Sequence, residues 1–155
     1  MDNKTVTKSI TVNGRVDYIY GLWENFETFP TFMENIEQVT SAGDDLWHWV
    51  MEGPLGTRLE WTAETTTREP NKRIAWNSKD MDADVKTSGQ VVFSDLPQGQ
   101  TEVTVTMHYE PNKGGLAGDV VAALFGQPEK RLEEDLRNFK NFAEGRIDRL
   151  PSLEG

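Results

Sequence analysis

The sequence contains no cysteine and only two histidines among its 155 residues. A chain without cysteine forms no disulfide and has no thiolate to act as a metal ligand or a nucleophile. The two histidines, His48 and His108, lack the carboxylate spacing of a metal centre. The sequence therefore predicts no metal site and no cofactor. The absence of cysteine also fits a reducing compartment.

Excess positive charge and long apolar runs are missing as well. The 26 acidic and 16 basic residues give a formal net charge of −10, which repels the phosphates of nucleic acids and anionic lipids. No run of about 18 consecutive apolar residues occurs, and residues 1–5 lack the apolar core of a secretory signal. We therefore expect no nucleic-acid partner, no membrane insertion and a cytoplasmic location.

No segment rich in proline, glycine or serine divides the chain, and no internal repeat is present. A chain of 155 residues has the usual length of one domain. We therefore predict a single domain over residues 1–155, with an ordered core at about 3–147 and a tail at 148–155.

The N-terminal part of the chain predicts one strand followed by two short helices. In residues 4–13, β-branched apolar side chains alternate with small polar ones, as in a half-buried strand. Between residues 16 and 26, apolar residues recur with the spacing of a helix. Pro30 must end that helix or begin another, and the apolar residues around it predict a second short helix.

Residues 35–110 predict an antiparallel meander of six strands. Alternation is clearest from residue 101 to residue 110, where apolar side chains share one parity and polar side chains take the other. One face of the sheet is therefore predicted to be buried, and we call it the dry face, whereas the other is exposed to solvent. Turn signals separate the strands at residues 43–45, 53–56, 69–71, 79–80 and 96–99.

Two helical segments follow the meander. Residues 116–125 carry apolar side chains at helical spacing until Gly126 and Pro128 interrupt the pattern. Pro128 suits the first position of a new helix, and Gly145 suits its end. The apolar stripe of this last helix consists of Leu132, Leu136, Phe139, Ala143 and Ile147.

Only the terminal helix is long enough to cover the dry face, so the sheet must curve around it. The predicted class is α+β: a helix-grip fold whose curved, antiparallel, seven-stranded sheet wraps a long C-terminal helix, with two short helices between the first two strands. Small residues interrupt the large ones on the inward parity. Because of this mixture, the residues alone leave open a packed interface or a cavity. The small inward residues are Ala63, Thr65, Thr67, Thr87 and Gly89.

Six segments carry the marks of a known family. They are WENFETFPTFM at 23–33, HWVMEGP at 48–54, RIAW at 73–76, GQVVF at 89–93, LFGQP at 124–128 and DLRNFK at 135–140. In order and spacing they resemble the START-like (SRPBCC) superfamily, and within it the bacterial polyketide cyclase/dehydrase and coenzyme-Q-binding-like branch. The resemblance implies a deep apolar pocket between the terminal helix and the sheet. It does not name a ligand, because such members include cyclases and carriers of lipids and quinones.

The inward side chains of the strands include no ionisable group except the phenol of Tyr109, which predicts a hollow free of charge. General acid or base catalysis needs a positioned group with a shifted pKa. Tyr109 is therefore the one catalytic candidate, as a hydrogen-bond donor to a carbonyl, and a structural hydrogen bond to the backbone is the alternative. His48 and His108 fall on the outward parity. This distribution favours binding over catalysis.

Three hypotheses follow. The leading one is a carrier or sensor of a hydrophobic small molecule such as a lipid, quinone or polyketide. The second is a polyketide cyclase/dehydratase-type enzyme, and the third is a protein-interaction module with an acidic surface. A homo-oligomer is compatible with each.

The ligand-binding residues are expected on the inward parity of the strands and on the helical stripes. The tryptophans among them either line a pocket or fill the core. Glycines at 114, 115 and 118 suggest a hinge that gates entry, with Phe29, Phe32 and Met33 as the opposite lip; a plain surface loop is the alternative. The expected ligand-binding residues are Trp49, Met51, Leu59, Trp61, Ala63, Trp76, Val91, Phe93, Val105, Met107, Tyr109, Leu116, Val120, Leu124, Leu132, Leu136 and Phe139.

Overall fold

The computed structural model describes residues 4–33, 36–52, 56, 58–79, 85–111 and 128–145. Seven antiparallel strands form one curved sheet in the order β1-β7-β6-β5-β4-β3-β2. The strands are β1 (Lys4–Asn13), β2 (Ile36–Gly43), β3 (Leu46–Glu52), β4 (Arg58–Glu69), β5 (Arg73–Ser78), β6 (Val85–Leu96) and β7 (Gln100–Pro111). The helices are α1 (Val16–Glu24), the 3-10 helices η1 (Phe26–Thr31) and η3 (Pro97–Gly99), and α3 (Pro128–Ala143).

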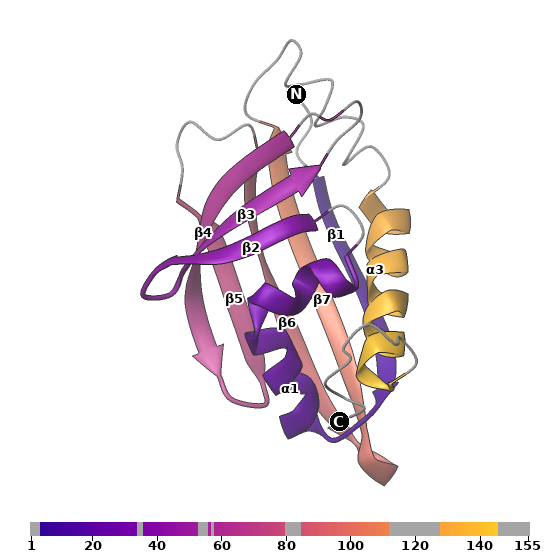
Figure 1. The fold of residues 1–155 in the computed structure, drawn as a ribbon. Helices are drawn as coiled ribbons and strands as arrows, with labels where there is room; N and C mark the ends of the chain where they lie inside the picture. Colours follow the sequence, from indigo (N-terminus) through magenta and orange to yellow (C-terminus); the bar gives the residue numbers. More distant parts are fainter. Residues whose placement is uncertain are drawn as a thin grey trace.

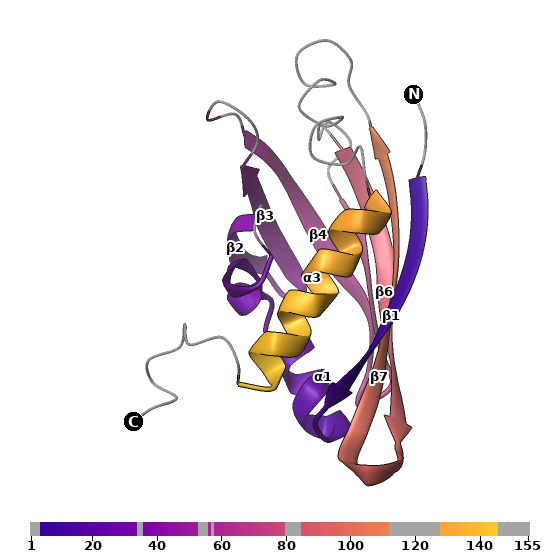
Figure 2. The same ribbon diagram turned by 90° about the vertical axis from the view of Figure 1, so that its right-hand side faces the viewer.

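The predicted meander is confirmed, and β1 extends it at one edge by pairing with β7, whereas β2 forms the opposite edge. This pairing runs from Lys4 opposite Tyr109 to Asn13 opposite Gln100. Because β1 lies beside the last strand, the N-terminal strand and α3 become neighbours (Figures 1 and 2). The helix-grip fold predicted from the sequence is therefore present, with α3 across the concave face of the sheet (Figure 2).

The helix predicted over residues 16–26 is shorter in the structure than its apolar stripe indicates. It ends at Glu24 because Asn25 adopts φ −92° and ψ 78°, which is not helical. Phe26 begins the 3-10 helix η1 instead, and Pro30 lies inside that second helix. The break turns the rings of Phe26 and Phe29 under β3, where each contacts Trp49 at ring-centroid distances of 6.1 and 5.5 Å.

The helix α3 begins at Pro128 as predicted, and Gly145 follows its end with φ +78°. This left-handed conformation favours glycine, and the Gly145 amide donates to the carbonyl of Phe142 at 3.1 Å. The helix is fixed along β1: Lys140 Nζ donates to the carbonyl of Thr11 at 2.9 Å, and the Asn13 amide donates to Glu144 at 2.8 Å. Ile147, predicted for the stripe, lies outside the described residues.

One part of the core lies where α1 and α3 both cover the sheet. Its fully buried side chains come from four elements and include Val12, Ile19, Val103 and Phe139. Phe139 of α3 contacts Trp23 of α1 at a ring-centroid distance of 4.9 Å. Burial at this density is typical of a well-packed interior. The opposite end of the concave face is different.

Candidate functional site

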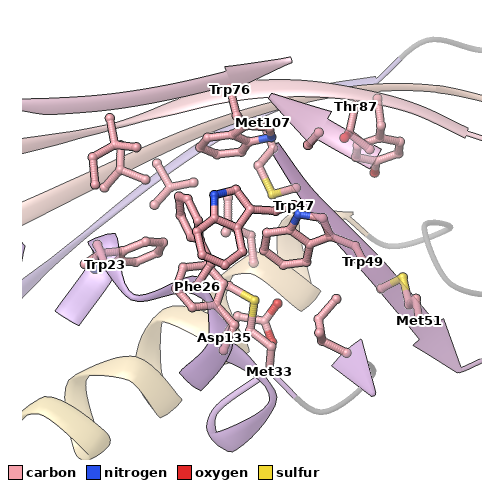
Figure 3. A pocket seen from close by; sticks show the side chains of 18 of the residues that line it. Trp23, Phe26, Met33, Trp47, Trp49, Met51, Trp76, Thr87, Met107 and Asp135 are labelled. Carbon is pink, nitrogen blue, oxygen red and sulfur yellow. The ribbon is translucent and has the colours of Figure 1, made fainter. Parts of the chain in front are cut away.

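A cavity of about 110 Å³ lies between α3, η1 and the concave face of the sheet (Figure 3). Trp76, Thr87 and Met107 lie on its sheet side, whereas Phe26, Met33 and Asp135 lie on the side of the helices (Figure 3). The wall is made of Val6, Trp23, Phe26, Phe29, Met33, Ile36, Trp47, Trp49, Met51, Trp61, Ala63, Thr65, Ile74, Trp76, Thr87, Val91, Val105, Met107, Tyr109, Arg131, Leu132, Asp135 and Leu136.

All five tryptophans of the chain line this cavity. Trp49 and Trp61 are directly opposite each other on β3 and β4, and their rings stack at a centroid distance of 6.1 Å and an angle of 3°. Phe26 meets Trp47 edge to face at 5.4 Å. Such rings offer flat apolar surface at little cost in side-chain entropy. The wall is therefore suited to a hydrophobic molecule with flat surfaces.

Gly89 gives the sheet side of the cavity its flat floor. A Cβ atom at this position would lie 2.8 Å from Cζ2 of Trp76 and would also meet the carbonyl oxygen of Thr106. Since Trp76 is paired with Gly89 across β5 and β6, the missing side chain lets the indole ring lie against the neighbouring strand. A larger residue here would push the ring into the cavity.

Five buried polar groups on the wall have no hydrogen-bond partner among the described residues. They are the hydroxyl oxygens of Thr65 and Thr87, the indole nitrogens of Trp23 and Trp47 and the Nε of Arg131. Most buried polar groups in proteins are hydrogen-bonded, and leaving one unpaired costs roughly 1–3 kcal/mol. A cavity that keeps such groups is suited to a ligand with polar atoms as well as apolar surface.

Tyr109 is buried on this wall, with 2% of its surface exposed. Burial raises the pKa of its phenol to about 12, although the positive charge of Arg131 opposes the shift. The phenol is therefore neutral near pH 7 and keeps its proton. This state suits a hydrogen-bond donor and not a general base.

The expectation of a charge-free hollow is wrong, because Arg131 and Asp135 of α3 also line the cavity. The strands do contribute only Tyr109 as an ionisable group. On the helix, however, Arg131 and Asp135 directly precede Leu132 and Leu136, so they share the border of the inward stripe. Four residues separate the two charges, which places them on one helical face. That spacing was visible in the sequence.

The cavity brings together most of the ligand-binding residues expected from the sequence, and their role in binding stays a prediction. On the wall are Trp49, Met51, Trp61, Ala63, Trp76, Val91, Val105, Met107, Tyr109, Leu132 and Leu136.

Three expected residues lie in the packed core instead of on the wall. Phe93 contacts Tyr20 of α1 at 5.3 Å, and Phe139 contacts Phe32 at 5.3 Å. Leu59 is 1% exposed and also absent from the wall. Leu59 and Phe93 have the expected inward parity, but parity gives the face of a strand and not the position along it. Phe139 lies on the expected stripe of α3, toward its packed C-terminal end. Leu116, Val120, Leu124 and the glycine hinge lie outside the described residues.

Several wall residues were not among those expected to bind ligand. Phe29, Phe32 and Met33 were expected as a lip. Phe29 and Met33 border the cavity, whereas Phe32 packs against Phe139 of α3. Trp47 has the inward parity of Trp49, so alternation on β3 indicated it. Ile74, Thr65 and Thr87 also have the inward parity of their strands, and Arg131 and Asp135 border the apolar stripe of the helix. The other additions are Val6, Trp23, Phe26, Ile36, Thr65, Ile74, Thr87, Arg131 and Asp135.

The two histidines are bonded to neighbouring strands away from the cavity. His48 lies 2.9 Å from Glu60, and His108 lies 2.7 Å from the Thr5 hydroxyl. Among the described ranges, no group of three side chains of the metal-binding types comes together. Nor does any helix in that part of the chain have the length and apolarity needed to cross a membrane.

The fold and the enclosed aromatic cavity define a START-like helix-grip protein. Comparison with solved structures agrees: the Zhui aromatase/cyclase from Streptomyces sp. R1128 superposes with a TM-score of 0.75 at 18% identity, covering 96% of this chain and 98% of that one. A START superfamily protein from Mycobacterium smegmatis gives a TM-score of 0.69 at 19% identity, covering 94% and 98%. At these identities the likeness concerns the fold alone.

The family follows from closer matches. The family described as polyketide cyclase / dehydrase and lipid transport matches residues 12–137, and this chain belongs to it. An uncharacterised 17.2 kDa protein of Streptomyces lincolnensis is 33% identical over 141 residues, which are 91% of this chain and 90% of the relative. DR_A0006 from Deinococcus radiodurans is 30% identical with a TM-score of 0.71, covering 92% and 98%. Family and fold both fit the binding of a hydrophobic ligand.

Proposed function

We propose that the protein is a carrier or sensor that binds a hydrophobic small molecule in the cavity. The observation that carries this proposal is that all five tryptophans surround one enclosed space of about 110 Å³. Ligand sites are typically apolar concavities with a few placed polar groups. Lipids, quinones and polyketides are the candidate ligands, and the family description names polyketides and lipids among these.

Native mass spectrometry of gently purified protein and a thermal-shift panel of lipids, quinones and polyketides test the proposal. We expect a retained small molecule or a panel member that raises the melting temperature. Ala63→Phe places a ring in the cavity and should abolish the shift. Ala75→Phe is the matched control, because alternation puts Ala75 on the outer face of β5. The proposal fails if nothing is carried and no panel member shifts the wild-type protein.

A polyketide cyclase/dehydratase-type enzyme is the second candidate. The observation that favours it is a neutral phenol, Tyr109, in the same cavity as Arg131 and Asp135. A hydrogen bond from the phenol to a carbonyl would stabilise an enolate during ring closure. Turnover of a polyketide-like substrate by the wild-type protein, reduced by Tyr109→Phe, would support this role. Turnover that survives Tyr109→Phe would remove it.

The remaining expectations concern location and partners. A chain without cysteine and with a formal charge of −10 fits the cytoplasm and an absence of nucleic-acid partners. Fractionation and a gel-shift measurement at low salt are the direct tests. A homo-oligomer is tested by light scattering.

A further inference from the structure

Two threonine hydroxyls on the cavity wall differ from a third one elsewhere in the core. Thr65 of β4 and Thr87 of β6 are 8% and 3% exposed, and neither hydroxyl has a hydrogen-bond partner in the part of the chain that the structure describes. Thr101 of β7 is just as buried, but its hydroxyl donates to the carbonyl of Gly14 at 2.8 Å. A buried hydroxyl without a partner is unfavourable. The two unpaired hydroxyls are therefore suited to a polar atom of the ligand.

These two hydroxyls lie on either side of one tryptophan. Thr65 is directly opposite Trp76 across β4 and β5, and Trp76 is opposite Gly89 across β5 and β6. Thr87 lies two residues before Gly89, so it points to the same face of β6. Figure 3 shows Thr87 and Trp76 on the same side of the cavity. A flat molecule lying on the Trp76 ring therefore has a hydroxyl from each neighbouring strand at its edge.

The other unpaired groups on the wall are hydrogen-bond donors. The indole N–H groups of Trp23 and Trp47 and the Nε–H of Arg131 are buried and have no partner within the described ranges. Indole and guanidinium groups donate but do not accept, whereas a threonine hydroxyl does both. A ligand atom that accepts hydrogen bonds, such as a carbonyl oxygen, therefore suits both the unpaired N–H groups and the two threonine hydroxyls.

The volume of the cavity limits the size of the ligand. One water needs about 10–15 Å³ of such space, so the cavity of about 110 Å³ holds roughly seven to eleven water-sized groups. Two fused aromatic rings with a small carbonyl substituent have about 12–13 non-hydrogen atoms, which is near the upper end of this range. A long acyl chain is larger, and it lacks the flat faces that pack against indole rings.

We propose that the ligand is a compact two-ring aromatic molecule bearing a carbonyl oxygen, and that Thr65 and Thr87 select for that oxygen. This inference rests on the proposed binding function and narrows its ligand to one chemical class. It assigns specificity to two residues that sequence reasoning noted only as small inward positions.

Two probes of nearly equal shape test the selection. The first is 2-acetylnaphthalene, and the second is 2-isopropenylnaphthalene, in which a CH₂ group replaces the carbonyl oxygen. Isothermal titration calorimetry on the wild-type protein should show the ketone binding about 2- to 12-fold more tightly, the range expected for one hydrogen bond. This comparison needs no variant. Equal affinities, or tighter binding of the hydrocarbon, would overturn the proposal.

Valine variants then locate the selection. Thr65→Val and Thr87→Val keep the side-chain shape but remove the hydroxyl, so the combined variant should lose the preference for the ketone while its affinity for the hydrocarbon stays unchanged. Thr66→Val is the matched control, because Thr66 is exposed on the same strand. A preference that survives the double variant would overturn the assignment to these threonines.

Two further probes separate this inference from the proposed function. If 2-naphthoate binds more tightly than the ketone, Arg131 sets the ligand class and the inference is wrong. If palmitate binds and neither naphthalene does, the binding function stands but the two-ring ligand is wrong. If none of the four probes binds and native mass spectrometry finds no ligand, both proposals fall.

Discussion

The two ends of the concave face show how one sheet and one long helix produce both a packed core and a cavity. At one end, α1 contacts β6 and β7, and the side chains of Ile19, Val103 and Phe139 are fully buried. At the other end, the helical cover is η1 and the first turns of α3, and the wall keeps unpaired hydroxyls on Thr65 and Thr87. The packed end stabilises the fold, whereas the hollow end retains unsatisfied groups that a ligand would satisfy.

The same contrast runs along α3. Its C-terminal end is held to the N-terminal segment by hydrogen bonds from Lys140 to the Thr11 carbonyl and from Tyr18 to the Ala143 carbonyl. Its N-terminal half, which borders the cavity, is linked to β1 by ion pairs from Lys8 to Glu129 and Glu133. Exposed ion pairs contribute little to stability. We therefore expect ligand entry to involve the N-terminal half of the helix.

The largest effect should come from removing a ring at the packed end. Phe139→Ala should lower the free energy of unfolding by about 3–5 kcal/mol, because a fully buried ring is replaced by a cavity. Met107→Ala, on the hollow side and half-buried, should cost less than about 2 kcal/mol. Urea denaturation measures both. Equal losses would show that the two ends are packed alike.

The next largest effect on stability is expected at a buried threonine, and two threonines are compared. Thr101→Val leaves the Gly14 carbonyl without its donor and should destabilise the protein by about 1–3 kcal/mol. Thr87→Val removes a hydroxyl that has no partner, so it should leave the stability unchanged or raise it. The two variants make the same chemical change and differ only in the partner. A loss at Thr87 as large as that at Thr101 would contradict the contrast.

The smallest effect concerns the ion pair between Lys8 and Glu133, whose atoms lie 3.0 Å apart. The hydrogen bond from Lys8 lowers the pKa of Glu133, so this stabilisation is present above the usual carboxyl pKa of about 4.5 and is lost as the pH falls through the lowered value. Lys8→Met should therefore lower the melting temperature by about 1–2 °C at pH 7 and by nothing at pH 2.

Lys72→Met is the control for this variant, because Lys72 is exposed and has no ion pair with the described residues. Both variants should respond alike at pH 2. If the melting temperatures of the two variants differ by the same amount at pH 7 and at pH 2, the Lys8 side chain acts through packing and not through the ion pair.

Strand parity predicted much of the candidate site but not its extent. It placed Trp49, Trp61 and Trp76 correctly on the inward face. Phe93 also has the inward parity, but it packs against Tyr20 in the core and does not line the cavity. Alternation has a period of two and carries no information about which end of a strand the helices cover. The apolar stripe of α3 does not indicate the charges of Arg131 and Asp135, because these residues lie beside the stripe and not on it.

The sequence by itself determined the α+β class, the seven strands and the start of the terminal helix at Pro128, because these depend on local periodicity and on turn residues. Tertiary structure alone decided that a cavity exists and which residues enclose it. Helix placement across the sheet is a long-range result: α1 fills one end, and the flat Trp76 ring over Gly89 keeps the other open. Likewise, whether a threonine hydroxyl finds a partner depends on residues far away in the chain, such as Gly14 for Thr101.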